Sequence, residues 1–329
     1  MATQTDRFRA RRFDSDRQDE MVSFDEALTQ APSDRQLLWL DICGPLEKDE
    51  IDRLAASFQL DPVTRLALAK PLDEPHLSVH GQYLHVALAV EPDDANPRAT
   101  AWLCVIAARN VVITHHLERV GFLDDIDDRL KVDTSLGHLD SDAFLVTLLD
   151  TTVTSYFRAV DAIEDDVDRL DSRSLRDKGR DELLEELVAV RRRISALRRL
   201  LAEHRSLYAA LPTIALRDAD ADSLNRDGFT AVAGRFSQAM SAVEASRDVV
   251  LGSFDIYMTR TAHRTNEVMK VLTLATVLLL PGSMIAALLG MNVIVPLDAE
   301  SPYSFWLVVA GVLALALVIV GTAIRKRWL

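Results

Sequence analysis

Residues 266–292 of the chain read NEVMKVLTLATVLLLPGSMIAALLGMN. Within this stretch, residues 271–290 are twenty consecutive positions without a charged side chain. At about 1.5 Å of rise per residue, a helix of that length just crosses the roughly 30 Å hydrocarbon core of a bilayer. A second uncharged run covers residues 305–324, and only fourteen residues, 291–304, separate the two runs. The end of the sequence therefore predicts two helices that cross a membrane as a hairpin.

The first span carries its polar side chains on one helical face. Its hydroxyl side chains are Thr273, Thr276 and Ser283, and their spacing places them on one side of a helix with 3.6 residues per turn. Such hydroxyls can bond the preceding carbonyl or join two helices. We favour a water-filled path, because the face leads to an asparagine and because Pro281-Gly282 interrupts the helix in its middle. Extended by threes and fours, this hydroxyl stripe consists of Asn266, Met269, Thr273, Thr276, Leu280, Ser283 and Ala287.

The ends of the first span carry a short motif in a specific setting. The triplet Gly290-Met291-Asn292 follows the helix, TNEVMK at 265–270 precedes it, Pro281 lies inside it, and the chain ends in RKRWL at 325–329. Together these features resemble the CorA family of divalent-cation (magnesium) transporters and channels, of the two-span Gly-Met-Asn type. Earlier segments, LWLD at 38–41 and RNVVIT at 109–114, resemble the family in layout.

The chain departs from the family pattern next to the triplet. The family usually has a tyrosine before Gly-Met-Asn, and this chain has Leu289. The loop continues as VIVP at 293–296 instead of the commoner aromatic and acidic residues. These two departures bear on which divalent ion the protein prefers.

The resemblance implies a homopentamer in which five first spans line a central pore and five second spans surround them. Neutral oxygens suit a filter for Mg²⁺, because this ion gives up its waters reluctantly. We expect constrictions that close by dewetting at Met269, Leu272 and Leu280. Leu272 therefore joins the seven residues of the hydroxyl stripe as a pore-lining residue. The expected selectivity filter is Gly290, Met291 and Asn292.

The same resemblance implies the activity. We expect passive uptake of hydrated divalent cations, Mg²⁺ first and also Co²⁺ or Ni²⁺, driven by the membrane potential and gated by intracellular Mg²⁺. Asp255 matches by position the family's acidic residue that binds a regulatory Mg²⁺ between subunits; a surface aspartate near an oligomer contact is the competing interpretation. Asp298 and Glu300 in the loop would concentrate cations at the pore mouth. No cofactor is expected beyond Mg²⁺ as transported and regulatory ion.

Composition limits the partners and the compartment. The 329 residues carry a formal net charge of −13, which argues against nucleic acid as a partner. No nucleotide-binding loop and no catalytic constellation is present in the sequence, so we expect neither a nucleotide partner nor an enzyme. The loop lacks Lys and Arg, whereas Arg264, Lys270 and residues 325–327 flank the spans with positive charge. By the positive-inside rule, both termini are cytoplasmic and the short loop lies outside the inner (plasma) membrane. Cys43 and Cys104 are interpreted as buried free thiols.

The region before the spans predicts a mixed α/β domain followed by long helices. Strands are expected at 37–42, at 76–90 around a Gly81-Gln82 turn, and at 102–107 and 111–114 around an Arg109-Asn110 turn, with helices after Pro45 and at 63–70. Helical periodicity begins at Ser141, and a second, arginine-flanked heptad helix ends at Pro212. One last helix is expected over 229–290, on the order of 90 Å long.

The fold class is therefore α+β: a cytoplasmic mixed α/β domain whose long helices continue into a two-helix transmembrane hairpin, as a funnel-shaped homo-oligomer. The expected divisions are a mobile arm (1–20), the α/β domain (21–138), an antiparallel helical pair (139–228), a stalk helix with the first span (229–290), an external loop (291–304), the second span (305–324) and a basic cytoplasmic tail (325–329).

Three other interpretations remain. A zinc or other transition-metal transporter of the same superfamily usually has Gly-Val-Asn, so Met291 argues against it without excluding it. A membrane-anchored coiled-coil scaffold needs neither the hydroxyl stripe nor Asn292. His76, His80 and the His115-His116 pair suggest a zinc site, but scattered histidines are more often surface or strand-end residues, and we assign them no function.

Overall fold

The structure is a computed structural model that describes residues 7–14, 19–33, 35–70, 72, 74–90, 101–130, 140–176, 180–215, 223–291 and 302–325. The chain divides into two compact units, Met1–Leu251 and Gly252–Leu329, and each unit is described by itself. The strands are β1 (Phe8–Asp14), β2 (Glu20–Val22), β3 (Gln36–Cys43), β4 (His76–His80), β5 (Tyr83–Val90), β6 (Ala101–Ala108) and β7 (Val111–His116). The helices are α2 (Phe24–Thr29), α3 (Lys48–Phe58), α4 (Pro62–Ala69), α5 (Gly121–Leu130), α6 (Ser141–Arg176), α7 (Arg180–Ala215), α8 (Ser223–Leu289) and α9 (Pro302–Arg325).

The described strands form one mixed sheet in the order β2-β1-β3-β7-β6-β5-β4. Strands β3 and β7 are parallel, with Leu38 opposite Val111, and the other pairs are antiparallel. The hairpin turns contain Gly81 and Asn110 at positive φ (42° and 61°), residue types that adopt this conformation at low cost. The expected strands and helices of the α/β domain are therefore present, and the α+β fold class is confirmed.

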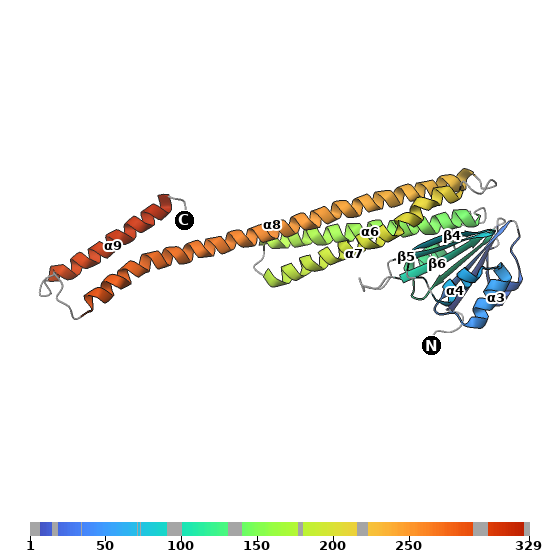
Figure 1. Cartoon of the computed structure of the whole chain (residues 1–329), viewed down its shortest axis with the longest axis horizontal. Coiled ribbons are helices and arrows are strands. Elements are labelled where there is room, and N and C mark those ends of the chain that lie inside the picture. Colours follow the sequence, from blue (N-terminus) through green and yellow to red (C-terminus); the bar gives the residue numbers. More distant parts are fainter. Residues whose placement is uncertain are drawn as a thin grey trace. The chain divides into compact units, whose positions relative to one another are not determined.

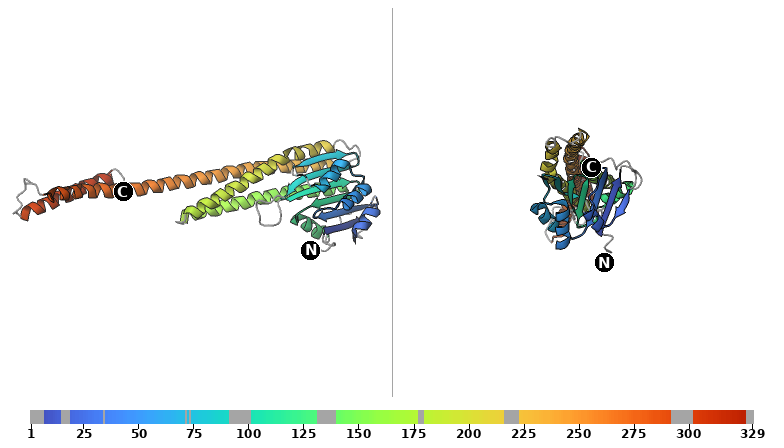
Figure 2. Two further views of the ribbon diagram at one scale, coloured as in Figure 1. Left: turned by 60° about the horizontal axis from the view of Figure 1, so that its bottom comes forward. Right: turned by 90° about the vertical axis from the view of Figure 1, so that its right-hand side faces the viewer.

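Alternation along the strands gives the sheet two apolar faces. On one face, Leu38, Leu40 and Ile42 of β3 pack with Ile51 and Leu54 of α3 in the main core. On the other face, the Trp39 ring lies 5.3 Å from the Phe144 ring of α6. Figures 1 and 2 show α3 and α4 against the first face and α6 along the second. Burial on both faces explains why the central strands are nearly continuously apolar.

Helix side chains also close the open end of β5. Strand β4 pairs with β5 only as far as Ala87, which lies opposite His76. Two residues further on, the Ala89 amide donates to Nε2 of His204 at 2.8 Å, and the Ala89 carbonyl accepts from the Tyr156 hydroxyl at 2.9 Å. Helices α7 and α6 therefore satisfy backbone groups that would otherwise be buried without partners.

The mobile arm expected for residues 1–20 is wrong for 8–14, which form β1 within the sheet. Ala10 and Phe13 are each 1% exposed. The arginines beside them pair with carboxylates distant in the chain: Arg9 pairs with Asp41 at 2.8 Å and Arg11 with Asp127 at 2.9 Å. A segment that looks charged and aperiodic is ordered because its charges are neutralised by tertiary contacts.

Helices α6 and α7 are joined by ion pairs in both directions, from arginines of each helix to carboxylates of the other. Arg193 pairs with Asp166, and Arg173 pairs with Glu186 at 2.7 Å. The first part of α8 packs with them, since the Phe236 ring is stacked on the Tyr208 ring of α7 at 4.1 Å. Gly228 of α8 lies so close to Val146 that a Cβ would be 3.1 Å from a methyl carbon, so any larger residue would require the Val146 side chain to shift.

The single helix expected over 229–290 is present as α8, whereas the expected end of a helix at Pro212 and the expected interruption at Pro281 do not occur. Helix α7 continues past Pro212 to Ala215, and α8 continues through Pro281 to Leu289. Pro212 lies in the last turn of its helix, so its missing amide removes one intrahelical hydrogen bond and little helix follows it. In a membrane span, a proline is tolerated because neighbouring groups satisfy the freed carbonyl. Two helices, α8 and α9, are long and apolar enough to cross a membrane, and the mean hydropathy of their apolar segments is 2.2 and 2.8.

Candidate functional site

The hydroxyls of the first span are satisfied by their own helix. Thr273 donates to the Met269 carbonyl at 2.7 Å, Thr276 to Leu272 at 2.8 Å and Ser283 to Leu280 at 2.9 Å. The expected bond to a preceding carbonyl is thus present. It uses the single hydroxyl proton and leaves the oxygen lone pairs as acceptors. A span with this arrangement presents acceptors, and no further hydroxyl donors, to whatever lies beside it.

Helix α9 lies against a different face of α8. The partly buried residues of the span, Leu274, Leu278 and Ile285, recur at helical spacing, together with Pro281 and Gly282. A Cβ on Gly282 would meet Val312 of α9 at 3.4 Å, which identifies this face as the contact between the two spans. At about 100° per residue, the mean direction of the hydroxyl stripe is roughly 155° away from that contact. All seven stripe residues and Leu272 are exposed in the single chain.

The end of the span forms a tight turn. The Gly290 amide donates to the Ala286 carbonyl at 3.0 Å, and Met291 follows with its side chain exposed. Asn292 and the loop carboxylates Asp298 and Glu300 lie outside the described residues. The structure thus describes two of the three expected filter residues, at the C-terminus of α8.

Asp255 lies on α8 with its side chain exposed. Among the described residues, no group of three or more His, Cys, Asp or Glu side chains is arranged to hold a metal ion. Within the described part of one chain, no further ligand side chains therefore gather around Asp255 to complete a metal site.

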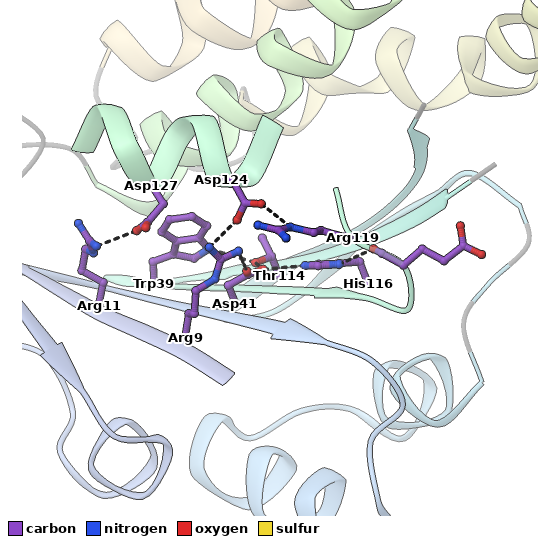
Figure 3. Close-up of polar contacts among 10 residues, drawn as sticks. Arg9, Arg11, Trp39, Asp41, Thr114, His116, Arg119, Asp124 and Asp127 are labelled. Atoms are coloured by element: carbon purple, nitrogen blue, oxygen red, sulfur yellow. Dashed lines mark hydrogen bonds and ion pairs between the residues drawn. The ribbon is translucent and has the colours of Figure 1, made fainter. Parts of the chain in front are cut away.

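A buried polar network, which the sequence analysis did not predict, lies on the α5–α6 face of the sheet (Figure 3). Its centre is Asp41 of β3, only 2% exposed. Asp41 accepts hydrogen bonds from Thr114 at 2.6 Å and from Arg9 at 2.8 Å, and its Oδ1 lies 3.1 Å from Nε2 of His116. Arg9 also bonds Asp124 of α5 at 2.5 Å. The network joins β1, β3, β7 and α5.

The protonation state of the network follows from its contacts. Burial by itself would raise the pKa of Asp41, but the hydrogen bond and charge of His116, the Thr114 bond and the Arg9 charge outweigh it, and the pKa lies below the ordinary value. Nδ1 of His116 lies 2.7 Å from the Glu118 carbonyl. The His116 ring therefore lies between two oxygen atoms, one of Asp41 and one of the Glu118 backbone.

The network has the residue types of a catalytic triad but not its geometry. The Thr114 hydroxyl donates to Asp41 and accepts from the Trp39 indole at 3.0 Å, so it is not bonded to the histidine. Thr114 is also fully buried. An activated nucleophile needs a base within hydrogen-bond reach and access to substrate. We therefore interpret the network as structural. The available sequence signal was Asp41, an ionisable residue inside an apolar strand.

Comparison with known proteins identifies relatives over most of the chain. The family described as "CorA-like Mg2+ transporter protein" matches residues 34–326. The cobalt/magnesium transport protein CorA of Thermotoga maritima is 25% identical over 301 residues, which cover 88% of this chain and 83% of that protein. The divalent cation transporter CmaX of Pseudomonas aeruginosa is 29% identical over 167 residues, 50% of this chain and 47% of that protein.

Two solved structures share the whole architecture. The complete structure of the CorA magnesium transporter from Methanocaldococcus jannaschii superposes with a TM-score of 0.78 at 20% identity and covers 100% of both chains. The full-length CmaX structure superposes with a TM-score of 0.75 at 21% identity and covers 98% of both chains. At these identities the likeness shows a common fold.

Proposed function

Because the chain belongs to the CorA-like Mg²⁺ transporter family, a family of divalent-cation transporters rather than enzymes, we propose that it forms a homopentameric membrane pore. The pore carries hydrated Mg²⁺, and also Co²⁺ or Ni²⁺, passively into the cell. Membrane potential drives this uptake: at about 2.3 kcal/mol per charge for 100 mV, a divalent ion gains roughly 4.6 kcal/mol. Intracellular Mg²⁺ gates it.

The observation that carries this proposal is the hydroxyl stripe on the face of α8 opposite its contact with α9. The waters around Mg²⁺ point their hydrogens outward, so a wall that passes the hydrated ion must present acceptors. Thr273, Thr276 and Ser283 are acceptors because their own protons are used within the helix. Two spans cannot enclose a channel. Several copies, with α9 outside and the stripe inside, would turn each stripe residue into a ring.

The remaining parts of the pore follow from the same arrangement. Gly290, Met291 and Asn292 would form the filter, since backbone carbonyls and a neutral amide hydrogen-bond the hydrated ion without stripping its waters. The rings of Met269, Leu272 and Leu280 would close the pore by dewetting. Asp298 and Glu300 from five chains would place about ten negative charges at the outer mouth and raise the local cation concentration.

The orientation is the one that the flanking charges favour. Arg264 and Lys270 precede the first span and Arg325 ends α9, so the positive-inside rule places both termini in the cytoplasm and the loop outside. Tyr303, Phe305 and Trp306 begin α9 with exposed rings, as aromatic residues do at a membrane interface.

The pore is tested by Thr276→Val, which keeps the side-chain shape and removes the acceptor. A lost hydrogen bond costs about 1 kcal/mol, so Mg²⁺ flux into liposomes should fall at least about fivefold. The matched control is Thr322→Val in α9, where the hydroxyl also bonds its own helix, to Ile319 at 2.9 Å. Equal flux in the two variants, or a monomer in detergent and in lipid, would refute the pore.

The filter is tested by Asn292→Ala, which should leave assembly intact and abolish uptake. Retained uptake in this variant would show that Asn292 is not part of the filter.

The preferred ion is tested in the same liposomes. Mg²⁺, Co²⁺, Ni²⁺ and Zn²⁺ are compared side by side, and a preference for Zn²⁺ would favour the zinc transporter instead.

Gating is tested at Asp255. In the proposal, Mg²⁺ bound near Asp255 offsets repulsion between neighbouring subunits and holds the pore shut when internal Mg²⁺ is plentiful. Asp255→Lys should therefore weaken inhibition of influx by internal Mg²⁺. Inhibition identical to that of the unmodified protein would remove Asp255 from the mechanism.

A further inference from the structure

Imidazole and thiol side chains gather on the α3–α4 face of the sheet. The register places His76, Ala87, Cys104 and His115 in one row across β4, β5, β6 and β7. His85 lies two residues before Ala87 and therefore on the same face. The small Ala87 in the middle of the row leaves a cavity lined in part by His85, Cys104 and His115, with room for about one water molecule.

His85 is the unusual member of this group. Its side chain is fully buried, and among the described residues its Nδ1 atom has no hydrogen-bond partner. Its Nε2 atom lies 3.3 Å from the Sγ atom of Cys104, a free thiol. The His76 ring is 5.6 Å from the His85 ring, measured between centroids. Burying an imidazole with a hydrogen-bond partner at only one ring nitrogen is costly, so a ring kept in this position is a candidate for a role beyond packing.

We propose that Cys104, His85 and His76 bind a transition-metal ion of the Zn²⁺ or Co²⁺ class. In a tetrahedral site, metal–sulfur and metal–nitrogen bonds of about 2.3 and 2.1 Å place the two ligands roughly 3.6 Å apart, close to the separation of Sγ and Nε2 here. No three such side chains among the described residues already converge, so the His76 ring turns to become the third ligand. Water in the cavity is the fourth.

The ligand set selects against Mg²⁺. Thiolate and imidazole suit Zn²⁺ and Co²⁺, whereas Mg²⁺ takes oxygen ligands in octahedral geometry. The site is therefore chemically separate from the transport path, and it does not rest on the proposed function. It would let the cytoplasmic domain respond to a transition metal in the presence of abundant Mg²⁺.

Metal binding deprotonates Cys104, because the thiolate rather than the thiol is the metal ligand. Metal binding thus breaks the S–H bond, forms the metal–sulfur bond and releases one proton to solvent for each ion bound.

The test is a Co²⁺ titration of the full-length protein in detergent with excess Mg²⁺. We expect one near-ultraviolet thiolate-to-cobalt charge-transfer band per chain, with release of one proton. Cys104→Ser should abolish the band, and His85→Gln should weaken Co²⁺ binding at least about tenfold. Cys43→Ser is the matched control and should keep the band. Absence of the band in the unmodified protein, its persistence in Cys104→Ser, or its loss in Cys43→Ser would overturn the proposal. If Cys104→Ser does not fold, His85→Gln decides, because unchanged affinity in that variant would also overturn it.

Discussion

Asp41→Asn tests whether the buried network holds the α/β domain together. Asparagine has nearly the same shape as aspartate but no charge, and its amide nitrogen can only donate. The carboxylate is surrounded by donors from three other positions: Thr114 at 2.6 Å, Arg9 at 2.8 Å and His116 at 3.1 Å. The substitution therefore leaves at least one buried donor without an acceptor and removes the counter-charge of Arg9.

The expected loss in free energy of unfolding follows from the burial of Asp41 and Arg9. Removing one member of a buried ion pair costs about 3–5 kcal/mol. Asp41 is 2% exposed, but the Arg9 side chain is 33% exposed and keeps its bond to Asp124. The lower end, about 3 kcal/mol, therefore applies. For a unit of roughly 150–250 residues, 1 kcal/mol lowers Tm by about 2–4 °C, so the expected shift is roughly 6–12 °C.

The assay is thermal unfolding of the full-length protein in detergent, followed by tryptophan fluorescence. The Trp39 indole donates to Thr114 and reports directly on the network. Asp124→Asn is the matched control. The Asp124 side chain is 22% exposed, compared with 2% for Asp41, and its partner Arg119 is 76% exposed. Ion pairs as exposed as these are worth about 1 kcal/mol or less. A Tm for Asp41→Asn equal to or above that of Asp124→Asn would refute the reasoning, since burial would then make no difference.

Two other predictions concern single contacts. His204 accepts the Ala89 amide proton at Nε2, so its ring must be neutral, and burial lowers its pKa despite an opposing bond from Nδ1 to the Leu200 carbonyl. As pH falls, His204 therefore takes up a proton in the unfolded state before it does so in the folded state, and the free energy of unfolding should fall below about pH 6.5. His204→Gln removes this titration and should flatten the measured slope of Tm against pH between 7 and 5. In the spans, Gly282→Ala should be tolerated, because its Cβ would meet Val312 at 3.4 Å, an ordinary contact. Gly282→Leu should overpack the contact by about 1–3 kcal/mol and lower the SDS midpoint of unfolding measured by circular dichroism; equal midpoints for the two variants would contradict this helix contact.

Local signals were sufficient for most of the elements. The strands around Gly81 and Asn110 were predictable because apolar runs flank residues that adopt positive φ. The heptad seam of α7 and the apolar periodicity of α6 were equally predictable from the sequence. The network around Asp41 was not, since Arg9 and Asp124 are 115 positions apart and nothing in either neighbourhood indicates the pairing. For the same reason, the arginine-rich start of the chain was mistaken for an arm.

For this protein, the sequence alone determined that two spans exist and that the first carries its hydroxyls on one face, because length, hydropathy and helical spacing are local properties. Which face of α8 meets α9 depended on the close approach of Gly282 and Val312, a contact between segments far enough apart that no local rule contains it. The pairing of buried charges and the meeting of His85 with Cys104 were likewise decided by tertiary structure. A charge or a ring nitrogen acquires its role only when the fold brings a partner within reach.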